Sequence, residues 1–244
     1  MNYKDLTWED ALLKSHKTLL NSHPRSSKKL IPPHQWIKET MKKNLGDGYK
    51  YYAIGESSDK YDKEYKVPGK FYDKMMDITI LKNSKVVGAI SFKFVASNYS
   101  QNSNNYFENL VGECFNIQSN DIPFCHVFVI RSKIPYYDNN KKVKRYEKIT
   151  QHNLDKYLKL NKFKDKGSPS KISMSIVDIV GDEYNGDIIH PGAFKNLDFT
   201  VKNKILNNIN VNMNDYSTYP KSVADELKSM EVNKILKEFA DIIM

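Results

Sequence analysis

Two acidic residues and one lysine in the middle of the chain are of the types that hydrolyse phosphodiester bonds. Asp77 stands before an apolar run, Lys93 lies inside a second apolar run, and Glu108 follows in a segment typical of a helix. Two carboxylates around one divalent ion can neutralise phosphate charge and position a water molecule. A lysine beside them can orient or deprotonate that water and support the charge of the pentavalent intermediate. These residues predict a metal-dependent phosphodiesterase site, if the fold brings them together.

The elements that must position these residues are two strands and a helix. Residues 78–81 and 86–94 have the composition of paired strands joined by a turn. Because side chains alternate along a strand, Ser91 and Lys93 share one face, and Phe92 faces the core on the other. An unpaired ammonium is expensive to bury, which favours a functional lysine. The alternative is an edge-strand lysine whose amine reaches water.

The arrangement of Asp77 with Ser91, Phe92 and Lys93 resembles the acidic–x–Lys strand of the PD-(D/E)XK nuclease superfamily. That superfamily normally has Glu or Asp two residues before the lysine, where this chain has Ser91. One subset of its type II restriction endonucleases also has serine there and supplies the carboxylate from the following helix. Glu108, fifteen residues after Lys93, fits the displaced position.

Glu113 is the reserve candidate for the displaced carboxylate. Five residues separate it from Glu108, so on a helix the two side chains point in different directions. We therefore expect that only one of them binds the ion. The sequence favours Glu108 by its spacing.

The resemblance implies a restriction-endonuclease-like α/β core, in which a central mixed β-sheet is flanked by α-helices. It implies Mg²⁺ held by Asp77, Glu108 and the main-chain carbonyl of Phe92, with Lys93 and Ser91 completing the catalytic set. The implied activity is sequence-specific cleavage of double-stranded DNA within a restriction-modification system, without a nucleotide cofactor. Such enzymes usually act as homodimers on palindromic sites, so a homodimer is expected.

Two other functions remain open from the sequence. One is another nuclease of the same superfamily that acts in repair or recombination. The other is a DNA-binding protein whose nuclease site has decayed, with Ser91 marking the lost carboxylate. Taken singly, Asp77 could be a turn or capping residue and Glu108 a solvated helix residue. The spacing of all three charged residues in a basic chain favours the nuclease.

Two polar segments could contact DNA. Residues 97–106 lie between Lys93 and Glu108, and their amides could grip phosphates or base edges. The alternative is a polar helix start capped by Ser103 or Asn104. Residues 134–147 predict a hairpin with interleaved tyrosine and basic side chains, suited to DNA or to a solvated turn.

Composition limits the class of protein. The chain has 244 residues, of which 40% are hydrophobic and 27% charged, enough for a folded core. Its net charge of +9 favours a polyanionic partner. No apolar run is long enough to span a bilayer, and no apolar signal segment begins the chain, so we expect a cytoplasmic bacterial protein without membrane contact. Cys114 and Cys125 match no zinc-binding spacing.

The periodicity predicts one domain over residues 1–244. Its expected parts are a helical N-terminal part (1–46), a catalytic core (about 49–180) and a C-terminal helix (about 221–244). Within them we predict a helix over 5–22, a second starting at 32–36 and another over 150–160, strands over 49–55, 121–131 and 172–180, and a loop over 181–200.

Overall fold

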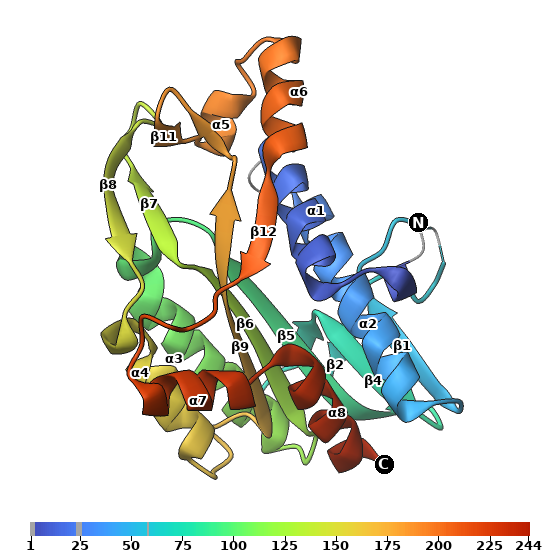
Figure 1. Cartoon of the computed structure of the whole chain (residues 1–244). Coiled ribbons are helices and arrows are strands. Elements are labelled where there is room, and N and C mark those ends of the chain that lie inside the picture. Colours follow the sequence, from blue (N-terminus) through green and yellow to red (C-terminus); the bar gives the residue numbers. More distant parts are fainter. Residues whose placement is uncertain (1–2, 23–25, 58) are drawn as a thin grey trace.

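A mixed six-stranded sheet lies at the centre of the protein, between two layers of helices (Figure 1). The computed structural model describes residues 3–22, 26–57 and 59–244. From one edge to the other, the strands are β1 (Tyr49–Ala53), β4 (Ile78–Lys82), β5 (Lys85–Val95), β6 (Phe124–Arg131), β9 (Lys171–Val180) and β12 (Asn210–Met213). The predicted α/β class, with a central mixed sheet flanked by helices, is confirmed. It is compatible with a restriction-endonuclease-like core.

The three central strands are parallel and the outer pairings are antiparallel. β5 pairs with β6 and β6 with β9 in parallel, whereas β1–β4, β4–β5 and β9–β12 are antiparallel. Parallel neighbours need a crossover connection. α3 (Tyr99–Gln118) connects β5 to β6, and α4 (Gln151–Lys162) leads into β9 after a hairpin of β7 (Lys133–Tyr137) and β8 (Val143–Lys148).

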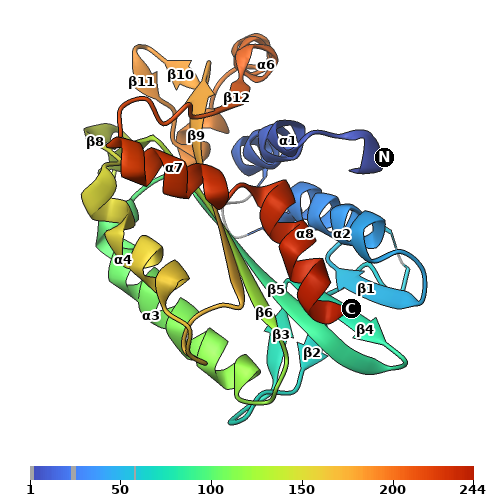
Figure 2. The same cartoon turned by 60° about the horizontal axis from the view of Figure 1, so that its bottom comes forward.

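Each face of the sheet has its own hydrophobic core. One cluster joins the sheet to α1 (Trp8–Asn21), α2 (Ile31–Leu45) and α8 (Val232–Ile243). The other joins it to α3, α4 and α7 (Lys221–Ser229). Figure 2 shows α3 and α4 on the side of the sheet away from α2. β5 contributes Ile90 and Phe92 to the first cluster and Ala89 and Val95 to the second. The alternation predicted for this strand is therefore confirmed.

The two leading helices begin and end where local chemistry allows. Thr7 caps α1 in a reciprocal capping box with Asp10. Pro32 and Pro33 occupy the first turn of α2, where a missing N–H breaks no helical hydrogen bond. Gly46, at φ +69°, ends that helix. Short 3₁₀ turns precede them, η1 (Tyr3–Asp5) and η2 (Ser27–Leu30).

Several regions differ from the sequence prediction. No element is predicted from the sequence for residues 56–76, where β2 (Tyr65–Val67) and β3 (Lys74–Met76) form a hairpin whose Val67 and Met76 are buried in the second core. The expected loop over 181–200 contains a short hairpin and two helix starts, and the edge strand β12 follows it. The elements are β10 (Glu183–Tyr184), β11 (Asp187–Ile188), α5 (Pro191–Phe194) and α6 (Phe199–Asn208).

Two expected helix boundaries are wrong. The C-terminal segment forms two helices, since Met230 is fully buried between them and the Glu231 side chain caps α8. α3 begins at Tyr99, so neither Ser103 nor Asn104 is its cap. Tyr99 is buried and donates a hydrogen bond to the Asn153 carbonyl, which anchors this earlier start.

Both cysteines, Cys114 on α3 and Cys125 on β6, are buried free thiols. None of the described helices combines the length and the apolar character that a membrane crossing requires.

Candidate functional site

A cavity of about 130 Å³ lies between the sheet and α3. Asp77 reaches it from the residue before β4, and Ser91 and Lys93 reach it from β5. His126 lines it from β6, and Glu113 from α3. Groups far apart in the sequence are thus brought together on one face of the sheet.

Asp77 is held at the sheet by a backbone hydrogen bond. The Phe92 N–H donates to its Oδ2 at 2.7 Å, and 26% of its side chain is exposed. Burial raises the pKa of this carboxyl to about 6, although the Phe92 N–H and the charges of Lys74 and Lys93 oppose the rise. Asp77 is therefore a carboxylate whose ionisation the fold disfavours.

Lys93 lies on the same side of the sheet as Asp77. Its Nζ is 4.3 Å from the centroid of the Tyr106 ring, a cation–π contact. Phe92 packs on the opposite face, with its ring 6.0 Å from that of Trp8. Burial lowers the pKa of Lys93, and the Asp77 carboxylate opposes this shift. The lysine is thus neither at an exposed edge nor paired to one fixed partner.

The helix carboxylate in the cavity is Glu113, whereas Glu108 is exposed and outside it. The face of α3 that lines the cavity carries Tyr106, Asn109, Leu110 and Glu113. This spacing of three, four and seven residues is one stripe of a helix. Glu108 lies about 200° around the helix from Tyr106 and faces away. The geometry therefore corrects the expected choice of Glu108 in favour of the reserve candidate.

Ser91 links Glu113 to a buried histidine. Its hydroxyl lies 2.6 Å from Nδ1 of His126. Ser91 and Glu113 line the same cavity, and Ser91 acts to lower the pKa of Glu113, against the larger effect of burial. Burial, with a contribution from Lys93, lowers the pKa of His126 to about 3, so the ring is neutral. Ser91 thus lies beside both the neutral His126 ring and the cavity that Glu113 lines.

Lys74 and His34 are two further side chains near the carboxylates of the cavity. Lys74 on β3 forms an ion pair with Glu113, Nζ to Oε1 3.2 Å, and its charge also acts on Asp77. His34 on α2 lies 3.9 Å from Oδ1 of Asp77, too far for a hydrogen bond. Burial lowers the pKa of His34 to about 3, so its imidazole is neutral and adds no positive charge beside Asp77. Burial raises the pKa of Glu113, and Lys74 opposes that rise.

The donor chemistry of the cavity fits a hard divalent ion. Within the described ranges, no group of three or more His, Cys, Asp or Glu side chains is arranged to hold a metal. Mg²⁺ does not need one, because it is usually bound by one or two carboxylates and keeps several waters. Asp77 and Glu113 supply two half-buried carboxylates to one cavity of about 130 Å³. The main-chain carbonyl of Phe92 stays a predicted third ligand.

The sequence did not point to His126, Lys74 or Tyr106. The helical stripe from Tyr106 to Glu113 was visible and could have selected Glu113 over Glu108. His126 depends on the register of β6 beside β5, which pairs it with Ser91. No local pattern encodes such a register between distant strands.

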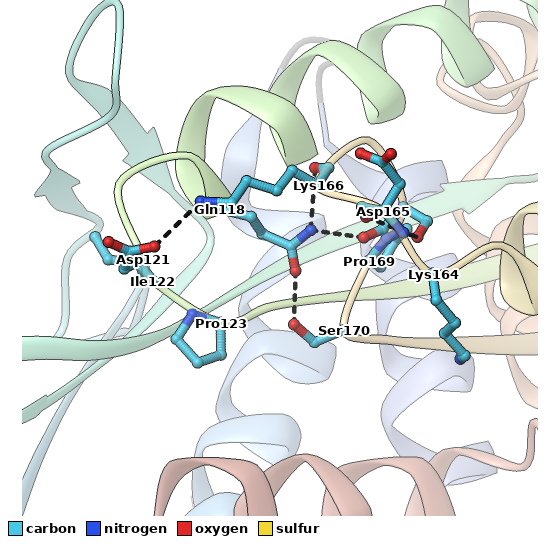
Figure 3. Close-up of a pocket in the computed structure, with 10 residues that line it drawn as sticks. Gln118, Asp121, Ile122, Pro123, Lys164, Asp165, Lys166, Pro169 and Ser170 are labelled. Carbon is cyan, nitrogen blue, oxygen red and sulfur yellow. Dashed lines mark hydrogen bonds and ion pairs between the residues drawn. The ribbon is translucent and has the colours of Figure 1, made fainter.

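Another cavity, of about 660 Å³, lies at the opposite end of the parallel strands and is open (Figure 3). Its polar groups bond to one another. Gln118 donates to the carbonyls of Lys166 and Ser168 and accepts from Ser170, and Lys166 pairs with Asp121 at 3.1 Å. These contacts tie the end of α3 to the loop before β9, which is a structural role.

Comparison with protein-family models, with curated proteins and with solved structures finds no match to this chain. The function is therefore inferred from the chemistry of the cavity.

Proposed function

We propose that this protein is a type II restriction endonuclease, which hydrolyses phosphodiester bonds of double-stranded DNA with Mg²⁺ held by Asp77 and Glu113. One observation carries the proposal. Two carboxylates and a half-buried lysine, from three separate elements, line one small cavity on the face of a mixed sheet. The resemblance of the Asp77 and Lys93 strands to PD-(D/E)XK nucleases supports the same chemistry.

Each side chain has a part in this reaction. When bound, Mg²⁺ would supply charge neutralisation at the phosphate and acidify a water. Asp77, ionised above its pKa of about 6, orients the cation and the water. Lys93 donates hydrogen bonds to a phosphate oxygen, and its lowered pKa lets Nζ exchange a proton with the attacking water more readily. Ser91 keeps the Glu113 carboxylate directed at the cavity.

The hairpin of β7 and β8 supports a DNA partner. It stands at one end of the molecule beside β11 and α5 (Figure 1). Cζ of Arg145 lies 3.7 Å from the centroid of the Tyr136 ring. Nζ of Lys133 lies 4.2 Å from the centroid of the Tyr146 ring. Cations stacked on rings are held in place while their charge stays available to phosphates. We propose that this hairpin contacts the duplex, and that two copies of the chain act on a palindromic site.

The choice between the two helix glutamates tests the site. Glu113→Gln should slow Mg²⁺-dependent plasmid cleavage by about 10²–10⁴-fold, because one of the two carboxylates in the cavity is lost. Glu108→Gln, on the exposed face of the same helix, is the matched control and should cleave normally. Equal loss in both variants, or loss only in Glu108→Gln, would refute the assignment of Glu113.

The pattern of cleavage tests the class of enzyme. Discrete bands from a plasmid indicate a restriction enzyme, and a smear or nicks indicate a nuclease of repair or recombination. A protein that binds DNA in Ca²⁺ and never cleaves it in Mg²⁺ would be a DNA-binding protein with a decayed site.

A further inference from the structure

A second cavity, of about 260 Å³, adjoins the candidate site at the end of β5. Lys93 and Tyr106 line both cavities and form the wall between them. The other walls come from α1, from η2, from the residues that follow Lys93 and from the start of α5. A group in the second cavity would therefore lie next to a group bound between Asp77 and Glu113.

The second cavity is lined by basic groups. Lys29 and Lys93 line it together with the imidazoles of His16 and His190, and none of the described residues around it is acidic. Burial lowers the pKa of Lys29, and the nearby charge of Lys93 lowers it further. Two ammonium groups that repel each other in a half-enclosed space favour an anionic ligand between them.

His16 is oriented by a buried ion pair. Arg131 donates to both carboxylate oxygens of Asp182, at 2.6 and 2.9 Å, and Nε2 of His16 lies 2.9 Å from Oδ2. Although burial opposes ionisation, His16 and Arg131 hold the pKa of Asp182 at about 2, so this ionised carboxylate accepts a hydrogen bond from the Nε2–H of His16. Nδ1 of the buried His16 ring has no hydrogen-bond partner within the described part of the chain.

The remaining polar walls are also held in place. The Ser15 hydroxyl donates to the Lys29 carbonyl at 2.6 Å, which fixes η2 against α1. Nδ1 of His190 accepts from the Gly192 N–H at 2.9 Å, so a neutral ring carries its proton on Nε2 as a donor. The cavity thus combines two ammonium groups with oriented imidazoles.

We propose that this second cavity binds a phosphate group, namely the phosphate next to the scissile one on the same DNA strand. The inference rests on the proposed function, since the scissile phosphate defines the neighbouring one. Consecutive phosphates of a strand are joined by one nucleoside, and the two cavities are separated by only one layer of side chains, Lys93 and Tyr106. Lys93 would then lie between the two phosphates, with Lys29 on the far side of the second.

A nucleoside bisphosphate is the smallest probe that carries two consecutive phosphates. Thymidine 3′,5′-bisphosphate and the two thymidine monophosphates can be titrated into the full chain in Ca²⁺ by calorimetry. We expect the bisphosphate to bind about tenfold or more tightly than either monophosphate. Lys29→Gln should remove most of this advantage, and Lys29→Arg should keep it. Lys28→Gln is the matched control, because Lys28 is an exposed neighbour outside the cavity.

Each outcome separates this inference from the proposed function. Plasmid cleavage without a bisphosphate advantage, or with equal loss in Lys28→Gln and Lys29→Gln, overturns the second site alone. Inorganic phosphate that binds as tightly as the bisphosphate, and depends on Lys29, overturns the strand assignment in favour of a free phosphate ligand. A Lys29-dependent bisphosphate advantage in a protein that never cleaves DNA supports the phosphate site and refutes the nuclease.

Discussion

At the residue scale, the fold raises the pKa of Asp77 and so favours its protonated form. Within the described part of the chain, the Phe92 N–H is the one hydrogen-bond donor to its carboxylate, and burial removes most of its water. A group whose pKa is higher in the folded state than in the unfolded chain binds protons more tightly when folded. Ionisation of Asp77 therefore reduces the free energy of unfolding as the pH rises from its ordinary pKa to about 6.

Asp77→Asn should accordingly stabilise the protein above pH 6 while it abolishes cleavage. The amide still accepts the Phe92 N–H and carries no charge, so we expect the free energy of unfolding at pH 8 to rise by about 1–3 kcal/mol. Below pH 4 the two proteins should be nearly equal, because Asp77 is then neutral as well. Denaturant unfolding at both pH values measures this. Asp73→Asn, at an exposed ion pair with Lys66, should show no such gain, and an equal gain there would contradict the explanation.

At the element scale, the hairpin of β2 and β3 adds a cation to the site. Val67 and Met76 anchor the hairpin in the core, and Lys74, which lies between these two residues in the sequence, reaches Glu113. In the protein without metal, the Lys74 ammonium partly balances the two carboxylates. The divalent ion that we propose at Glu113 would therefore compete with this ion pair.

Lys74→Gln should strengthen Mn²⁺ binding several-fold, since the competing ammonium is gone. Calorimetric titration with Mn²⁺ in the absence of DNA measures this directly. Lys66→Gln is the matched control on the same hairpin, where Lys66 pairs with Asp73 at 3.2 Å on the exposed side. Unchanged Mn²⁺ affinity in Lys74→Gln, with normal binding by the parent protein, would count against a metal site at Glu113.

At the scale of the whole molecule, a buried group of three side chains joins α1 to the sheet. His16 lies on α1, Arg131 ends β6, and Asp182 follows β9; all three are buried. Arg131 also donates to the Ile179 carbonyl at 2.9 Å. The hydrogen bond between His16 and Asp182 holds α1 against the end of the parallel strands. It thereby also positions the wall of the second cavity that α1 provides.

Asp182→Ala should destabilise the protein by about 3–5 kcal/mol, because it leaves the Arg131 charge buried and unpaired. Thermal and denaturant unfolding at neutral pH measure the loss. Asp225→Ala, at an exposed carboxylate on α7, should stay within about 0.5 kcal/mol of the parent. A loss in Asp182→Ala as small as that of the control would show that the network does not hold α1 in place.

The central pair of strands and the acidic residue before them can be identified from the order of the amino acids alone. The shared face of Ser91 and Lys93 then follows, because side chains alternate between the two faces of a strand. The class of fold was predicted from the resemblance of these residues to the PD-(D/E)XK superfamily, and the mixed sheet flanked by helices confirms that class.

Only the tertiary structure decided which helix carboxylate meets Asp77. The rotation of α3 about its axis is set by the packing of Leu110 and its neighbours on the sheet, and that rotation selects Glu113. The pairing of Ser91 with His126 depends likewise on the register between two strands, and the contact of Lys74 with Glu113 depends on a hairpin anchored in the core. These contacts depend on how segments that are distant in the sequence pack against each other, so local periodicity cannot encode them.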